Sequence, residues 1–190
     1  PIFPYTKIDN PAEVGASRLV AGETVGWFSG SSEFGPRALG NRSILANPRV
    51  PGMKDKLNQN IKYREEFRPF APVLIDEKLE NSLPRNLNLE SMTTVVEITD
   101  QDIKKFPEAV HLDNTSRVQV VDHNCRSKIY EVLREVEKLG EFPALINTSF
   151  NLKGEPIVDS PADAVRTFYS SGLDALILQN FIIAKDGMGR

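Results

Sequence analysis

The chain of 190 residues is poor in the side chains that bind metals or form disulfides, with one cysteine, Cys125, and two histidines, His111 and His123. A single thiol excludes an internal disulfide and suits a reducing compartment, so we expect a cytoplasmic protein. So few Cys and His side chains also argue against a structural zinc site. Neither histidine belongs to an i, i+4 pair that could hold a metal from one helix face. We therefore predict no protein-held metal.

Long apolar runs and the common catalytic motifs are also absent. No apolar run approaches the roughly 20 residues that a membrane helix needs, and no signal peptide opens the sequence, so we expect no membrane partner. The sequence has no Walker loop, dinucleotide fingerprint, HExxH motif or nucleophile elbow. If the chain handles a nucleotide, it must hold the phosphates without the familiar phosphate loop.

Ordinary proportions of hydrophobic (40%) and charged (26%) residues predict a globular domain. We expect residues 1–190 to form one domain, with residues 1–22 as a linker and an initial helix. The first residue is proline rather than methionine, and we expect this domain to be excised from a longer, two-domain enzyme.

The hydrophobic patterns predict strands and helices that do not alternate cleanly. We therefore expect an α/β (mixed α+β) fold with a twisted mixed parallel and antiparallel sheet and flanking helices. The predicted helices cover residues 12–21, 51–61, 76–83, 126–139 and 160–169. The predicted strands cover residues 24–28, 44–46, 71–75, 93–99, 116–121 and 143–147, and two more lie within 173–184.

A basic segment runs from residue 37 to residue 68. It contains eight basic and three acidic side chains, a net charge of +5, whereas the whole chain carries −3. Such a segment repels itself unless an anion neutralises it, and a guanidinium group fits pairs of phosphate or carboxylate oxygens. Charge runs are more often solvated faces, but Arg37 and Arg42 lie in a long loop, residues 29–43, rich in Gly and Pro. We therefore predict an anion site here.

Two further pairs of residues have a spacing of two. Lys62 and Arg64 follow the predicted helix over 51–61, and in extended backbone they would point the same way. Arg117 and Gln119 would share one face of a strand for the same reason. Arg68 has an alternative explanation, because it could pair with a neighbouring glutamate.

Three polar residues, Asn147, Ser149 and Asn151, alternate at the end of a predicted strand. Period-two spacing places them on one side of the following turn. Asn and Ser also bond their own backbone readily, so on the spacing alone ordinary turn chemistry is the better explanation of these residues.

Three stretches resemble the C-terminal domain of the NodU/CmcH-type carbamoyltransferases. They are residues 33–45 (EFGPRALGNRSIL), residues 62–72 (KYREEFRPFAP), and residues 147–151 (NTSFN) followed by 154–158 (GEPIV). The resemblance extends in order from about residue 26 to about residue 185. These motifs are long and unusual, and therefore far more specific than a lone glycine fingerprint.

The resemblance implies a YrdC-like fold and a carbamoyl-adenylate-forming activity. Such a domain converts carbamoyl phosphate and ATP, together with Mg²⁺, into carbamoyl adenylate and pyrophosphate. An N-terminal transfer domain of the same polypeptide then passes the carbamoyl group to an acceptor hydroxyl. Nothing in this chain resembles that N-terminal domain.

The resemblance also implies which residues act. Lys62, Arg64 and Ser149 match the catalytic positions of its Lys-x-Arg and Ser-x-Asn pairs. The residues expected to bind substrate or nucleotide are Arg37, Arg42, Ser43, Arg68, Thr115, Arg117, Gln119, Asn147 and Asn151. Residues 111–119 match a His-x-Asp-Gly-Thr-x-Arg-x-Gln block in which Asn114 replaces the usual glycine, a mild departure because Asn tolerates left-handed backbone.

Two other functions remain open at this point. A basic patch can dock RNA, although the chain is acidic overall and lacks the interleaved aromatic residues of single-strand binders, which makes a nucleic-acid partner unfavoured. Alternatively, the domain binds carbamoyl phosphate or a nucleotide without catalysis.

Overall fold

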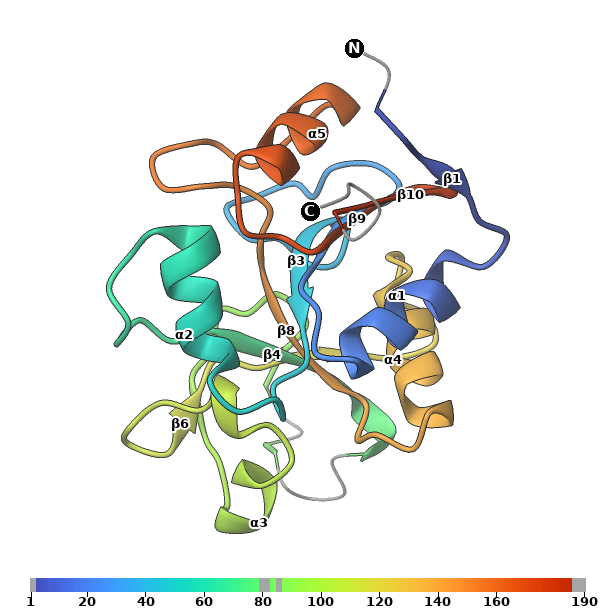
Figure 1. The fold of residues 1–190 in the computed structure, drawn as a ribbon. Coiled ribbons are helices and arrows are strands. Elements are labelled where there is room, and N and C mark those ends of the chain that lie inside the picture. The colour runs from blue at the N-terminus through green and yellow to red at the C-terminus, as the bar shows by residue number, and fades with distance from the viewer. Residues whose placement is uncertain (1–2, 79–82, 85–86, 186–190) are drawn as a thin grey trace.

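The central feature of the fold is an eight-stranded mixed sheet, seen in a computed structural model that describes residues 3–78, 83–84 and 87–185 (Figure 1). The strand order is β1-β10-β9-β2-β3-β8-β4-β7. Strands β2 and β9, and strands β4 and β7, pair in parallel, whereas the other neighbours are antiparallel. The strands are β1 (Thr6–Lys7), β2 (Val25–Phe28), β3 (Arg42–Ala46), β4 (Ala71–Ile75), β7 (Gln119–Val121), β8 (Ala144–Ser149), β9 (Ala175–Leu178) and β10 (Phe181–Ala184). A separate ribbon pairs β5 (Val96–Glu97) with β6 (Thr115–Ser116).

Helices cover both faces of this sheet. The α-helices are α1 (Pro11–Val20), α2 (Met53–Leu57), α3 (Asp100–Ile103), α4 (Ile129–Lys138) and α5 (Pro161–Tyr169). A π turn (Asn58–Lys62) continues α2, and 3-10 turns lie at Asp76–Lys78 and Pro107–Ala109. Helices α1 and α4 lie together on one side of the sheet, and α2 and α5 lie on the other (Figure 1).

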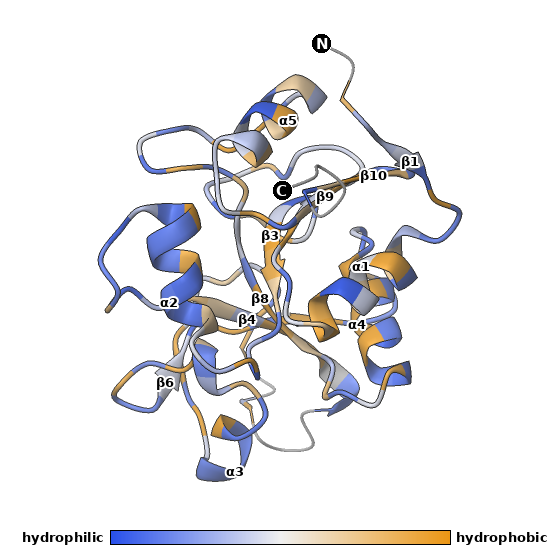
Figure 2. Cartoon of the chain, in the orientation of Figure 1, coloured by the Kyte–Doolittle hydropathy of each residue, from blue (hydrophilic) through white to orange (hydrophobic). Residues whose placement is uncertain are grey.

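Strand periodicity divides the core into two clusters. In β8, Leu145 packs with the cluster under α1 and α4, whereas Ala144 and Ile146 pack with the cluster on the side of α2 and α5. Successive side chains point to opposite faces of a strand, so a strand that is covered on both faces needs apolar residues throughout. Figure 2 accordingly shows hydrophobic residues along the central strands. This arrangement confirms the predicted mixed α/β fold.

Local caps begin two of the predicted helices. The side chain of Asn10 accepts a hydrogen bond from the Glu13 backbone N–H at the start of α1. Ser160 and Asp163 form a reciprocal capping box at the start of α5. Such caps satisfy backbone donors that have no partner within the helix. None of the helices described here is long and apolar enough to cross a membrane.

Several predicted boundaries were wrong. The strand predicted over 116–121 is split, because β6 joins the small ribbon and β7 joins the main sheet. The strand predicted over 93–99 shrinks to β5, and the loop predicted over 29–43 ends earlier because β3 begins at Arg42. Of the helix predicted over 76–83, a 3-10 turn covers Asp76–Lys78, and residues 79–82 lie outside the described residues.

Helix α4 offers a matched test of the core. Leu133 is fully buried against α1, whereas Leu139, which follows the same helix, is 49% exposed. Replacing Leu133 by Ala should lower the free energy of unfolding by about 2–5 kcal/mol, because it leaves a cavity. The control Leu139→Ala should cost less than about 1 kcal/mol. Urea titrations of both variants measure the difference, and equal losses would contradict this packing.

Candidate functional site

A cavity of about 460 Å³ opens where β8 ends, between the Arg37 loop and the segment that follows the π turn. We call this cavity the basic pocket. Its lining includes six basic side chains, one histidine and four polar residues, and no Asp or Glu is among the described residues that line it. These side chains are Arg37, Lys62, Arg64, Arg68, Arg117, Lys153, His111, Asn147, Thr148, Ser149 and Asn151.

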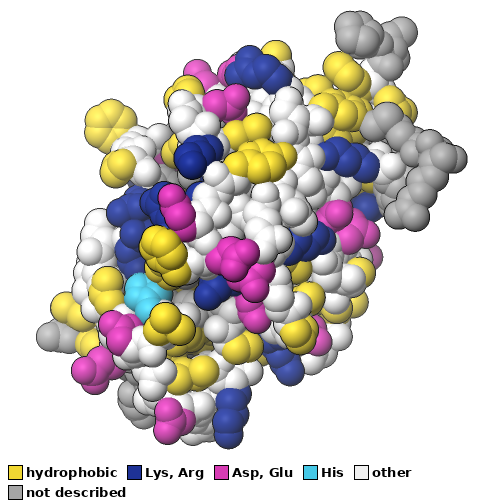
Figure 3. All heavy atoms as spheres, turned by 60° about the vertical axis from the view of Figure 1, so that its left-hand side comes forward, with side chains coloured by type: hydrophobic (Ala, Val, Ile, Leu, Met, Phe, Trp, Pro, Cys, Tyr) yellow, Lys and Arg dark blue, Asp and Glu magenta, His cyan; other side chains and the backbone are white. Residues whose placement is uncertain are grey.

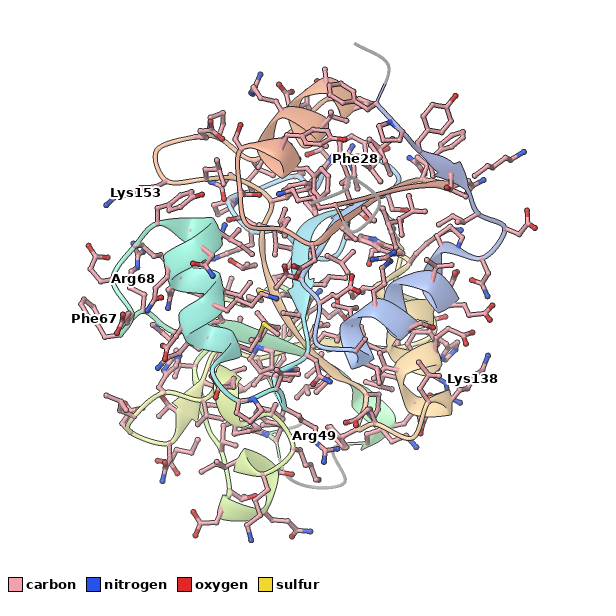
Figure 4. All side chains as sticks on the ribbon, viewed as in Figure 1. Phe28, Arg49, Phe67, Arg68, Lys138 and Lys153 are labelled. Carbon is pink, nitrogen blue, oxygen red and sulfur yellow. The ribbon has the colours of Figure 1, made fainter. Side chains whose placement is uncertain are left out.

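The charge is visible on the surface of the molecule. Figure 3 shows Lys and Arg side chains gathered on one face, with a histidine and several hydrophobic side chains beside them. Arg68 and Lys153 project on the same side of the molecule, beyond α2 (Figure 4). An unscreened group of like charges is repulsive, so an anion in the basic pocket would be stabilised there.

Lys62 is the buried cation of the basic pocket, with 6% of its surface exposed. Its Nζ donates to the backbone oxygens of Ser149 (2.5 Å) and Asn151 (3.0 Å), and lies 2.9 Å from Asn151 Oδ1 and 3.3 Å from Ser149 Oγ. Burial, followed by the charges of Arg64 and Arg68, lowers the pKa of Lys62 to about 7. Lys62 therefore changes its charge near neutral pH. Its hydrogen bonds to Ser149 and Asn151 hold the end of β8 at the basic pocket.

Lys62 and Arg64 face the same cavity, but not through extended backbone as predicted. The π turn continues through Lys62, and Tyr63 then adopts a left-handed conformation with φ 47°. Buried Asn58 organises the turn, because its Oδ1 accepts from Arg64 Nε at 2.7 Å and its Nδ2 donates to the backbone oxygen of Arg68 at 3.1 Å. Sequence reasoning missed Asn58, and the only signal was a polar residue on the apolar face of the helix.

Arg64 and Arg68 add charge at the mouth of the basic pocket. Arg64 stacks on Phe70 at 4.6 Å, and burial together with the charge of Arg68 lowers its pKa to about 10. Within the described residues, no ion pair joins Arg68 to either of the neighbouring glutamates. The alternative explanation of Arg68 as the partner of a glutamate is therefore not observed.

A single carboxylate shapes the loop that carries Arg37. Glu33 Oε1 accepts backbone N–H groups from Leu39 (2.7 Å), Asn41 (2.7 Å) and Arg42 (3.3 Å). This folds the loop so that Arg37 and Ala38 line the basic pocket. Burial and the nearby charge of Arg37 lower the pKa of Arg117. Glu33 was not predicted, although an acidic residue just before a Gly-Pro loop is a recognisable signal.

Asn147 lines the basic pocket and carries a buried acceptor, Oδ1, that has no partner among the described residues. Its Nδ2 donates to Gln119 Oε1 at 2.7 Å and to the backbone oxygen of Ala38 at 3.3 Å, while Gln119 Nε2 donates to the backbone oxygen of Leu39 at 3.1 Å. These contacts orient both amides, because each nitrogen meets an oxygen. Asn147 Oδ1 is buried and has no partner. A buried acceptor without a donor is costly, so a ligand donor would be favoured here.

Arg42 and Ser43, both predicted to bind substrate, do not reach the basic pocket. The Arg42 guanidinium donates to the backbone oxygens of Ser29, Asn41 and Gly30 at 3.0–3.1 Å and stacks on Phe28 at 3.5 Å. Ser43 Oγ accepts from the Gly40 N–H at 3.0 Å. Because β3 starts at Arg42, these two side chains are buried and form hydrogen bonds with backbone groups of the preceding loop.

Gln119 and Thr115, both predicted to bind substrate, also lie outside the lining. Residue 117 falls in the break between β6 and β7, and of Thr115, Arg117 and Gln119 only Arg117 lines the cavity.

Two other members of the basic segment form ion pairs outside the basic pocket. Arg49 pairs with Glu141 at 3.0 Å and Lys56 with Asp174 at 2.8 Å. Lys153, in the turn after β8, was not predicted and joins the basic pocket.

Fold and site together define an α/β domain whose mixed sheet carries a basic pocket at the end of β8, with no Asp or Glu among the described residues that line it. The carbamoyltransferase C-terminus family matches residues 16–185, and the chain belongs to this family. The predicted family is thus confirmed.

The relatives are considerably longer proteins. The chain is 41% identical over 182 residues to nodulation protein NolNO of Sinorhizobium fredii, covering 94% of this chain and 27% of that protein. It is 39% identical over 180 residues to nodulation protein NolO of Bradyrhizobium diazoefficiens, covering 93% and 33%. Nodulation protein U of S. fredii is 42% identical over 153 residues, covering 78% and 26%. The chain therefore spans about a quarter to a third of these relatives.

A solved structure shares the fold. Full-length HypF in its phosphate- and nucleotide-bound form superposes with a TM-score of 0.60 over 96% of this chain and 22% of that one. Sequence identity is 14%, so this likeness concerns the fold alone. It agrees with the mixed α/β fold that the sequence predicted.

Arg37 and Arg42 form a matched pair for testing the site. Arg37→Lys keeps the charge but loses the planar fork, and it should weaken pyrophosphate binding by about threefold to tenfold while leaving stability unchanged. Arg42→Lys should instead lower the free energy of unfolding by about 1–3 kcal/mol, because buried carbonyls lose their donors. Calorimetric titration and urea unfolding separate the two effects, and the reverse assignment would show that Arg42 is the ligand.

Lys62 predicts how anion binding depends on pH. Sulfate keeps its charge near neutrality, whereas Lys62, with its pKa lowered to about 7, loses its proton as the pH rises. Sulfate affinity should therefore fall by up to about tenfold between about pH 6.5 and pH 9. Lys62→Met should bind more weakly at every pH and lose this part of the pH dependence. An unchanged slope in Lys62→Met would contradict the assignment.

Proposed function

We propose that this chain is the carbamoyl-adenylate-forming domain of an O-carbamoyltransferase. It binds ATP and carbamoyl phosphate and forms carbamoyl adenylate; water replaces the phosphate of carbamoyl phosphate, which leaves as inorganic phosphate, and ATP loses pyrophosphate. An N-terminal domain of the longer polypeptide passes the carbamoyl group to an acceptor hydroxyl. Membership of the carbamoyltransferase C-terminus family supports the reaction class. The much greater length of the relatives supports a second domain.

One observation favours a carbamoyl ligand over a simple phosphate. The basic pocket combines cationic side chains with the unpaired, buried Oδ1 of Asn147. A carbamoyl phosphate carries an anionic end that arginine and lysine bind and an –NH₂ group that donates hydrogen bonds. The two ends of that molecule match the two kinds of group in the basic pocket.

The same lining bears on the nucleotide and its metal. Six basic side chains suit the phosphates of ATP, and the buried Nε of Arg117 has no partner. The described lining offers no carboxylate to a metal, and no group of three or more His, Cys, Asp or Glu side chains occurs in the described residues. Mg²⁺, which binds readily through substrate phosphates, would therefore be held by the nucleotide rather than by this chain.

Ser149 is proposed as a ligand and not as a nucleophile. Its hydroxyl donates to Asn151 Oδ1 at 2.6 Å, while its oxygen lies 3.3 Å from Lys62 Nζ. No Lys or His is adjacent to Ser149 in the sequence, but the fold brings Lys62 next to it. However, the hydroxyl proton points to Asn151 and not to a base, which is the arrangement of a binding group. Mass spectrometry that trapped a carbamoylated Ser149 would overturn this role.

The half-reaction is tested by isotope exchange. With carbamoyl phosphate present, labelled pyrophosphate should enter ATP in the longer parent protein, and Lys62→Met or Arg64→Met should reduce the exchange by about 100-fold, since charge at the phosphates would be lost. The isolated chain should catalyse at most this exchange and should carbamoylate no acceptor. Carbamoylated acceptor formed by this chain alone would contradict the division between domains.

The carbamoyl group itself can be tested by comparing two ligands. Acetyl phosphate carries a methyl group where carbamoyl phosphate carries –NH₂, so it leaves Asn147 Oδ1 unpaired. An unpaired buried acceptor costs about 1–3 kcal/mol, so carbamoyl phosphate should bind roughly 5- to 100-fold more tightly. Asn147→Leu should remove this preference. Competition titrations measure both ratios, and equal binding by the parent chain would argue for a site that recognises phosphate only.

A further inference from the structure

His111 is a titratable group in the basic pocket with no role so far. It lines the cavity together with Arg37 and Arg117. Its Nδ1 lies 2.9 Å from Thr115 Oγ1, and no partner of Nε2 is recorded within the described part of the chain. Thr115, predicted to bind substrate, does not line the cavity itself. Any influence of Thr115 on a ligand would therefore pass through His111.

The hydrogen bonds around Thr115 decide which imidazole nitrogen carries the proton. Asp113 Oδ1 accepts both the Thr115 hydroxyl at 2.7 Å and the Thr115 backbone N–H at 3.1 Å. Thr115 has a single hydroxyl proton, which it donates in the hydrogen bond to Asp113. The Thr115 oxygen is then only an acceptor toward His111, so Nδ1 must be the donor. Neutral His111 therefore has its lone pair on Nε2.

The turn that holds this chain of bonds is tightly defined. The His111 N–H donates to the backbone oxygen of Thr115 at 2.8 Å, and the Asn114 N–H donates to the backbone oxygen of His111 at 3.1 Å. Asn114 takes the left-handed conformation, φ 59°, that the turn requires. The imidazole is thus held in place before any ligand arrives.

His111 is linked by hydrogen bonds to a carboxylate and shares its cavity with cations. The bonds from Thr115 lower the pKa of Asp113, so this carboxylate stays ionised at the end of the hydrogen-bond chain. A bound anion would neutralise the cations that line the basic pocket. The pocket cations are Arg37, Lys62, Arg64, Arg68, Arg117 and Lys153.

We propose that His111 is a proton-exchanging ligand of the basic pocket. When an oxyanion binds, Nε2 takes one proton from solvent and donates the resulting N–H to an anion oxygen. Thr115 and Asp113 act as positioning residues, because they keep the other proton on Nδ1 and support the imidazolium charge. The group that His111 recognises is a phosphate or carboxylate oxygen of the ligand. This proposal relies on the proposed function only in that the basic pocket binds an anion.

Nitrogen-15 NMR of the imidazoles tests this directly, because the chain has only two histidines. At about pH 7, free His111 should show the Nδ1–H tautomer, which is the minor form in free histidine. Saturating sulfate should move the His111 Nε2 resonance toward its protonated position. Exposed His123, outside the basic pocket, is the internal control and should not move. Thr115→Val and Asp113→Asn should each shift free His111 toward the Nε2–H tautomer.

Binding measurements complete the test. His111→Gln should weaken pyrophosphate binding by about threefold to tenfold near pH 6, and by less than twofold near pH 8.5, because a charge-assisted bond is lost only where the imidazole is protonated. His123→Gln should change neither value. Sulfate that binds without moving His111 would overturn this proposal alone. The absence of any sulfate or pyrophosphate binding would overturn both this proposal and the proposed function.

Discussion

The buried ammonium of Lys62 joins two segments that are 87 residues apart in the chain, the end of the π turn and the end of β8. A cation that is 6% exposed must be surrounded by oxygens, and those of Ser149 and Asn151 supply them. The contact places Arg64 and Arg68 on one side of the cavity and the polar end of β8 on the other. The basic pocket exists because this ion is solvated by protein oxygens.

Neutral amides, rather than carboxylates, orient Arg64 and Asn147 in the basic pocket. Asn58 positions Arg64, and Gln119 orients Asn147, while the carboxylate of Glu33 accepts from backbone N–H groups of its loop. A carboxylate within the lining would neutralise an arginine and compete with an anionic ligand. An amide fixes geometry without cancelling charge, so the positive potential remains available for phosphates.

Much of the site was predictable and some was not. Lys62, Arg64 and Ser149 were predicted from their motifs, and the structure places all three in the lining of one cavity. Arg42, predicted from the same motifs, does not line the cavity, because a motif does not show which way a side chain points. With β3 starting at residue 42, its guanidinium turns inward to three carbonyls. His111 and Lys153 were not predicted as site residues, because the sequence does not show which loops meet at the cavity.

Local physical chemistry in the sequence determined the helix caps, the apolar strands and the family. Asn10, Ser160 and Asp163 act within a few residues, so their effect could be read directly. The tertiary structure alone decided which charges share a cavity. Arg49 and Lys56 form ion pairs with acidic residues outside the basic pocket. Arg117 and Lys153 lie outside the basic segment in sequence but line the basic pocket. The physical reason is that charges interact through distance in space, which depends on strand order and register rather than on separation along the chain.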